Sequence, residues 1–221
     1  MSHNQFIEGL ESRQFLSVTP IFNASVVADR LVVRADLLHF ESDIFANEAK
    51  LLVDIQNIKK NVAKGDTSLK APFAQLHADV HTMQTALKED RLTEAANALA
   101  DESVIKLDEV QVLKNKGNAM AEAAAHTALR NERIKLQNDL IAGLDARIAT
   151  RQADETTISN DTQAIATAAE SDASATPALK AAAATFAADR LTCLNTLTAD
   201  LQAIAAARTT LVAALTAAES T

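Results

Sequence analysis

The sequence predicts an all-α protein, an elongated antiparallel four-helix bundle with long helices and a non-helical N-terminal arm. Its 221 residues include only four glycines and three prolines and no tryptophan or tyrosine, a composition typical of long helices with few turns. Apolar residues recur at spacings of three, four and seven, which keeps them on one face of a helix. Short turn sequences separate four long segments, and helices joined by such turns must fold back on one another.

The first helix is expected over residues 20–64. Thr19 suits the N-cap, Pro20 suits the first helical position, and Gly65 follows the end of the segment. Asn47 takes a place that the pattern would give to an apolar residue, and a polar residue there more often sets the helix register than performs chemistry. The apolar stripe of this segment consists of Val33, Leu37, Phe40, Ile44, Leu51, Ile55, Ile58 and Val62.

The second helix is expected over residues 68–116, after candidate caps at residues 66–68 and before Gly117. It begins with the clearest coiled-coil heptad of the chain. Beyond Lys88 the phase of the pattern slips, so we expect a stutter or kink near residue 90. The heptad residues are Leu69, Phe73, Leu76, Val80, Met83 and Leu87.

The third helix is expected over residues 118–171 and the fourth over residues 177–219. Thr176 suits the N-cap of the fourth helix, and Pro177 suits its first position. The third segment carries on its apolar side Ile134, Ile141, Leu144, Ile148, Ile158 and Ile165. Together the four helices are expected to form a single domain over residues 20–221.

The expected fourth helix has almost no face suited to water. It is rich in alanine and leucine, and its charged side chains are Lys180, Asp189, Arg190, Asp200, Arg208 and Glu219. A helix that is apolar or small all round is buried on several sides, so we expect its own chain and then a neighbouring subunit to cover it. The side chains expected to form this packing seam are Leu194, Leu197, Leu201, Ile204, Leu211 and Leu215.

Charge and composition exclude several classes of protein. The formal net charge of -8 argues against a nucleic-acid partner, because phosphate contacts need clustered lysine and arginine. The single cysteine, Cys193, allows no internal disulfide. No ordinary signal peptide is expected in the segment before Pro20, because charged residues interrupt the apolar residues of that segment. No stretch of the sequence reaches about 18 uninterrupted apolar residues, so no transmembrane helix is expected.

No catalytic, cofactor-binding or metal-binding constellation is expected, so the chain is predicted not to be an enzyme. His77 and His81 lie four residues apart on one helix face, but two imidazoles without a third ligand favour a solvated flank of the heptad. Glu122 and His126 also lie four residues apart, and the Glu-x-x-His spacing of di-iron bundles does not occur. The scattered glycines form no phosphate-binding loop.

The N-terminal arm, residues 1–19, differs in character from the rest. Its stretch from Gly9 to Val18 resembles the Leu-Glu-Pro-Arg-x-Leu-Leu-Ser motif found near the N-terminus of many large surface and extracellular proteins of planctomycetes and some other bacteria. Matching residues are Leu10, Glu11, Arg13, Leu16 and Ser17, whereas Ser12 replaces the proline and Phe15 the first leucine of the pair. The resemblance implies a sorting or surface-association element and an extracellular or cell-surface location. Without it, the chain would be placed in the cytoplasm.

These patterns favour a structural protein that assembles into a surface fibre or sheath. Contacts between subunits that do not close on themselves produce filaments. On this hypothesis the partner is a further copy of the chain, and the fourth helix and the N-terminal arm make the contacts. The arm residues expected to take part are Phe6, Leu10, Glu11, Arg13, Phe15 and Leu16. The alternative is a helical-bundle adaptor or sensor-like module that binds a partner helix or a small ligand.

Overall fold

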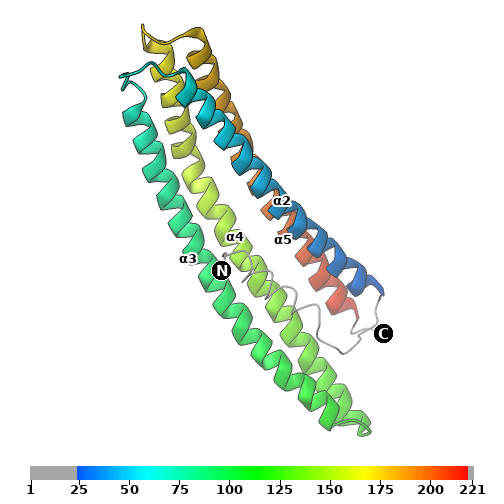
Figure 1. Cartoon of the computed structure of the whole chain (residues 1–221). Coiled ribbons are helices and arrows are strands. Elements are labelled where there is room, and N and C mark those ends of the chain that lie inside the picture. Colours follow the sequence, from blue (N-terminus) through cyan, green and yellow to red (C-terminus); the bar gives the residue numbers. More distant parts are fainter. Residues whose placement is uncertain (1–23, 219–221) are drawn as a thin grey trace. The chain divides into compact units, whose positions relative to one another are not determined.

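The computed structural model describes residues 24–218, and in this range the chain forms four long α-helices and no strand (Figure 1). The helices pack against one another through apolar faces, so the prediction of an all-α helical bundle is confirmed. They are α2 (Ala24–Asn61), α3 (Lys70–Lys114), α4 (Ala119–Ser171) and α5 (Pro177–Ala217). None of these helices contains a stretch apolar enough to cross a membrane within the described range.

Local turn chemistry sets the helix ends. Gly65 and Gly117 follow α2 and α3 with φ angles of 91° and 90°, a conformation that L-residues with a Cβ rarely adopt. Thr176 caps α5, because its Oγ1 accepts a hydrogen bond from the Leu179 backbone nitrogen over 3.1 Å, and Pro177 is the first helical residue. The expected cap at Thr19 lies outside the described residues.

The observed helix bounds differ from the expected ones by a few residues. α2 ends at Asn61, before the expected end at residue 64, and α3 begins at Lys70, after the expected start at residue 68. Asp66 orders the turn between them, because its Oδ1 accepts a hydrogen bond from the Ser68 backbone nitrogen over 2.8 Å. α3 is helical without interruption through residue 90, where the slip in the apolar pattern predicts a stutter or kink.

The described residues form two compact units, and all four helices contribute to each. Unit 1 contains residues 24–36, 89–146 and 203–218, and unit 2 contains residues 37–88 and 147–202. The sequence patterns predict a single domain over this range. The single domain expected over residues 20–221 stays a prediction, because each helix continues from one unit into the other.

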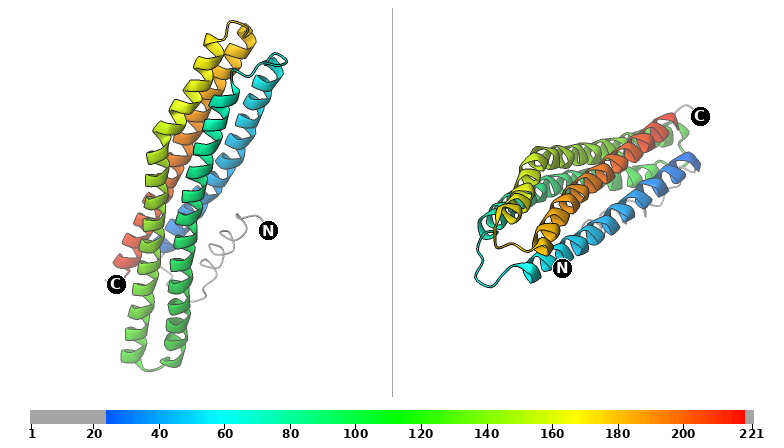
Figure 2. Two further views of the ribbon diagram at one scale, coloured as in Figure 1. Left: turned by 90° about the vertical axis from the view of Figure 1, so that its left-hand side faces the viewer. Right: turned by 90° about the horizontal axis from the view of Figure 1, so that it is seen from above.

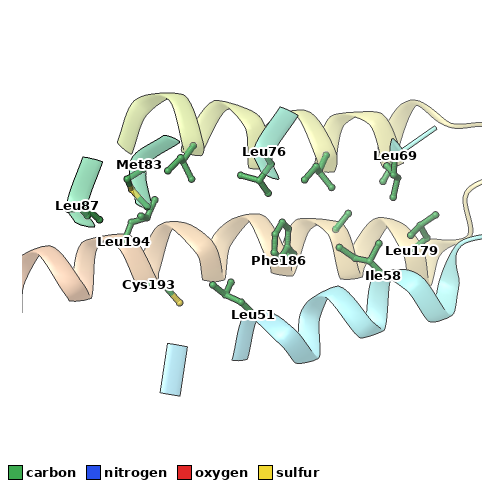
Figure 3. Close-up of a cluster of buried hydrophobic side chains, with 14 residues drawn as sticks. Leu51, Ile58, Leu69, Leu76, Met83, Leu87, Leu179, Phe186, Cys193 and Leu194 are labelled. Carbon is green, nitrogen blue, oxygen red and sulfur yellow. The ribbon is translucent and has the colours of Figure 1, made fainter. Parts of the chain in front are cut away.

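Unit 2 holds an apolar core to which all four helices contribute. The turn from α2 to α3 and the turn from α4 to α5 lie at the same end of this unit, so each pair of helices is antiparallel there (Figures 1 and 2). Side chains from α2, α3 and α5 point toward one another in the core (Figure 3). The buried members from α2, α3 and the turn between them are Leu51, Ile58, Leu69, Leu76, Met83 and Leu87, and those from α4 and α5 are Ile158, Ile165, Ala169, Leu179, Ala183, Phe186, Cys193 and Leu194.

Unit 1 combines buried apolar side chains with buried polar contacts. Arg133 Nη2 lies 3.1 Å from Glu109 Oε1, and Lys135 pairs with the buried carboxylate of Asp101. Hydrogen-bonded ion pairs of this kind satisfy polar groups that burial has removed from water. One apolar cluster of this unit lies between α3 and α4 and consists of Ala98, Ile105, Val112, Ala125, Leu129, Leu136 and Leu140.

Candidate functional site

A cavity of about 700 Å³ lies within unit 2, between the C-terminal part of α2, the turn that follows it, the start of α3 and α5. Its volume falls in the range of about 300–1,000 Å³ that is usual for pockets that bind small molecules. The apolar wall residues are Leu51, Ile55, Ile58, Val62, Leu69, Phe73, Leu76, Val80 and Phe186. The polar residues at the wall are Lys59, Asp66, Thr67, Lys70, His77 and Arg190.

The two main walls of the cavity have the same residue spacing. In α2 the wall residues lie at 51, 55, 58 and 62, and across the turn and α3 they lie at 69, 73, 76 and 80. Each set follows the spacing of four, three and four that keeps side chains on one helix face. These are the stripes that the sequence predicts as helix-packing faces. In the structure they also line the cavity, and residues 55, 62, 73 and 80 are only half-buried.

Two phenylalanines close one side of the cavity. The ring centroids of Phe73 on α3 and Phe186 on α5 lie 5.8 Å apart, and their planes are inclined by 40°. A tilted pair at this distance is favourable, because the positive edge of one ring meets the negative face of the other. Phe186 stands at the centre of the core, between side chains from α2 and α3 (Figure 3).

The charged residues at the cavity are mainly cationic, although the whole chain is acidic. Lys59, Lys70 and Arg190 line it together with a single carboxylate, Asp66. Arg190 is half-buried, and burial lowers the pKa of its guanidinium while the nearby Cys193 thiol acts in the opposite direction. Within residues 24–218 the structure gives Arg190 no carboxylate partner, and its buried Nε has no hydrogen-bond acceptor.

Asp189, the acidic residue next to Arg190 in the sequence, is engaged with a lysine of α2. Asp189 Oδ1 lies 2.8 Å from Lys50 Nζ. The pKa of the Asp54 carboxyl is raised, mainly by burial and also by the charge of Asp189 and a hydrogen bond with Asp189. Burial also raises the pKa of the Cys193 thiol. Lys50, Asp54, Asp189 and Cys193 therefore form a polar cluster between α2 and α5, which we call the α2–α5 cluster.

His39, Asp43 and Asp200 bring together three side chains that are able to bind a metal ion. One ligand atom from each lies within 4.8 Å of the others, and all three residues belong to unit 2. His39 Nε2 lies 3.7 Å from Asp43 Oδ2, one helical turn further along α2. His77 and His81 are both exposed, and His77 is at the cavity wall.

The expected packing seam on the fourth helix is mostly used by the chain itself. Five of its residues are buried within the protein: Leu194, Leu201, Ile204, Leu211 and Leu215. Leu197 is half-buried. These side chains are therefore not presented to a neighbouring subunit as expected, because the sequence pattern reports burial without saying which chain provides it. The arm residues Phe6, Leu10, Glu11, Arg13, Phe15 and Leu16 lie outside the described residues.

A different apolar surface is exposed on α2. In unit 2 the side chains of Leu38, Phe45 and Leu52 are 57%, 61% and 57% exposed and follow one another at intervals of seven. This heptad spacing places them on one face of α2, which we call the outer α2 stripe. Periodicity alone does not single out this stripe, because the inner stripe of the same helix has a similar apolar content.

Sequence reasoning also missed the cationic side of the cavity. Arg190 is noted in the sequence as one of few charges on an apolar helix, but its place at a cavity depends on α2 and α3 packing against α5. A rare arginine on such a helix is the signal that would have drawn attention to it. Comparison of the chain with protein-family models, curated proteins and solved structures gives no match.

Proposed function

We propose that the protein is a helical-bundle binding module that holds a small apolar ligand in the cavity of unit 2. The observation that carries this proposal is the cavity itself, about 700 Å³ in volume and walled by two matching apolar stripes. The cavity is partly open to solvent at its exposed polar residues, so a ligand would enter there and cover apolar side chains that are only half-buried.

The expected affinity is moderate. Each 100 Å² of apolar ligand surface removed from water contributes about 2.5 kcal/mol. The loss of translational and rotational freedom offsets several kcal/mol of this gain. A ligand that buries roughly 400 Å² gains about 10 kcal/mol, and after a loss of about 4 kcal/mol it binds with a dissociation constant on the order of tens of micromolar.

Titration with Nile red, an uncharged dye that fluoresces in apolar surroundings, tests the proposal. The wild-type chain is expected to bind the dye at one saturable site. Val80→Trp adds volume at a half-buried wall position and is expected to weaken binding, whereas Val104→Trp, at an exposed position of α3 in unit 1, is expected to leave it unchanged. Circular dichroism checks that both variants stay helical. No saturable binding, or equal binding by both variants, would contradict the proposal.

A second proposed function is the self-assembling structural subunit, a surface or extracellular fibre or sheath. The outer α2 stripe supports it, because three large apolar side chains at heptad spacing and more than half exposed are typical of a face that packs on another helix. On this proposal the subunit contact is the stripe, assisted by the arm of residues 1–19, rather than the buried leucines of α5. On this proposal, copies of the chain assemble into a homopolymer at the cell surface.

Light scattering and negative-stain electron microscopy at high concentration test assembly. The full chain is compared with a chain that lacks residues 1–19 and with a Leu38→Gln, Phe45→Gln, Leu52→Gln variant. Met120→Gln, which changes an exposed apolar side chain of unit 1, is the control. Fibres from the full chain and the control but not from the stripe variant would support assembly through α2. Dispersed monomers from every chain would exclude assembly under these conditions and leave the binding module.

A further inference from the structure

We infer that the ligand of the unit 2 cavity is an amphiphile with one hydrocarbon chain and a carboxylate head, and that Arg190 binds the head. This inference rests on the proposed binding function and adds the chemical class of the ligand. The cavity offers an apolar volume for the chain and a guanidinium for the carboxylate.

The charges at the cavity favour an anion. Three cations, Lys59, Lys70 and Arg190, line it with one carboxylate, Asp66. The Oδ1 of Asp66 accepts the hydrogen bond of the Ser68 backbone nitrogen over 2.8 Å, so this carboxylate already serves to order the turn. In a chain with a formal charge of -8, a local excess of cations is contrary to the average and attracts a negatively charged ligand.

Arg190 is the cation best placed to select the head group. It lies on α5 four residues after Phe186, so its side chain and the Phe186 ring share one helix face at the cavity. Lys59 and Lys70 are exposed, where water solvates an ammonium group well, whereas Arg190 is half-buried.

The guanidinium also lacks a carboxylate within the described part of the chain. Asp189 precedes it in the sequence, but that carboxylate is 2.8 Å from the ammonium of Lys50. The Nε of Arg190 is buried and has no acceptor within residues 24–218. A half-buried cation without an acceptor is costly, and a ligand carboxylate would remove this cost through a bidentate pair.

Displacement of Nile red by dodecanoate and by dodecanol measures the contribution of the charge, since the two probes share one chain length. Dodecanoate is expected to bind the wild-type protein about 10-fold to 100-fold more tightly than dodecanol, the range for a charge-assisted hydrogen-bonded pair. Arg190→Gln is expected to remove this preference and to keep the affinity for dodecanol. Arg190→Lys is expected to restore part of it, and Lys64→Gln, an exposed lysine outside the cavity wall, is the control.

The outcomes separate the two proposals. If Nile red, dodecanol and dodecanoate all fail to bind the wild-type chain, the binding function itself is wrong. If all three bind and the alcohol binds as tightly as the acid, only the head-group inference is wrong. The same conclusion follows if Arg190→Gln still binds Nile red and still prefers the acid by the wild-type factor. Retained Nile red binding by Arg190→Gln shows that the cavity is intact in that variant.

Discussion

Arg208 Nη1 donates a 2.8 Å hydrogen bond to Gln137 Oε1, and both side chains are buried, at 3% and 9% exposure. The pair connects α5 and α4 within unit 1. A buried guanidinium is tolerated only when acceptors replace the water that it has lost. α5 therefore depends on polar contacts at this point as well as on its leucines.

We expect Gln137→Leu to lower the free energy of unfolding by about 1–3 kcal/mol. The change removes a hydrogen-bond acceptor from the buried guanidinium of Arg208 and keeps a side chain of similar volume. Urea denaturation followed by circular dichroism measures the change. Asn138→Leu, at the exposed neighbouring position of the same helix, is the control and should have little effect. Equal midpoints for the two variants would show that the hydrogen bond contributes nothing to stability.

The close approach of α4 and α3 in unit 1 predicts a second effect. A Cβ added to Gly143 would lie 2.7 Å from Glu94 Cγ and 2.9 Å from Glu94 Cβ, and both distances are too short for carbon atoms. Alanine gains about 1 kcal/mol of helix propensity over glycine. The overlap costs about 1–3 kcal/mol, and because the root of the Glu94 side chain cannot swing away, we expect Gly143→Ala to destabilise the protein.

Thermal or urea unfolding of Gly143→Ala measures this balance. Combining it with Glu94→Ala should recover part of the loss, because that change removes Glu94 Cγ and Cδ while leaving Cβ in place. A single Gly143→Ala variant that is more stable than the wild type would mean that the two helices separate at no cost.

Cys193 is expected to react slowly with thiol reagents. Its side chain is 4% exposed, and burial raises the pKa of the thiol, so both access and the thiolate fraction are reduced. We expect modification by Ellman's reagent to be at least about tenfold slower in the folded protein than in denaturing guanidinium. Fast modification in native buffer would show that the α2–α5 cluster opens readily.

Local signals account for what the sequence predicted well. The Thr176 and Pro177 pair and the glycines at 65 and 117 mark helix ends through the chemistry of one turn, which needs no knowledge of the rest of the fold. The apolar stripes on α2 and α3 likewise depend only on the helical period. These signals were sufficient for the fold class and for the approximate bounds of the helices.

Long-range packing accounts for what the sequence did not predict. Leu201 and Leu215 appear in the sequence as an apolar seam, and only the structure shows that the chain's own helices bury them. Lys50 and Asp189 form an ion pair although they are far apart in the sequence, and this pairing leaves Arg190 without that partner. The candidate site depends on such pairings, so it could not be found from periodicity.

The Asp54 carboxyl gives the protein a pH-dependent term in its stability. Burial is the largest of the effects that raise its pKa. The charge of Asp189 and the hydrogen bond between the two carboxyls also raise it, whereas the charge of Lys50 lowers it. The pKa of the folded state therefore lies above the ordinary value of 3.8, so the folded chain holds this proton more tightly than the unfolded chain. The resulting stabilisation is complete below the ordinary value and is lost as pH rises through the raised pKa.

Asp54→Asn keeps the shape of the side chain and removes its titration. We expect the variant to gain stability relative to the wild type as pH rises from about 4 to about 7, because only the wild type then buries a second negative charge beside Asp189. Urea midpoints of both proteins across this range measure the difference. Glu48→Gln, an exposed position of the same helix, controls for the change in net charge. A difference that stays constant with pH, or one that Glu48→Gln reproduces, would show that the Asp54 and Asp189 pair is not its source.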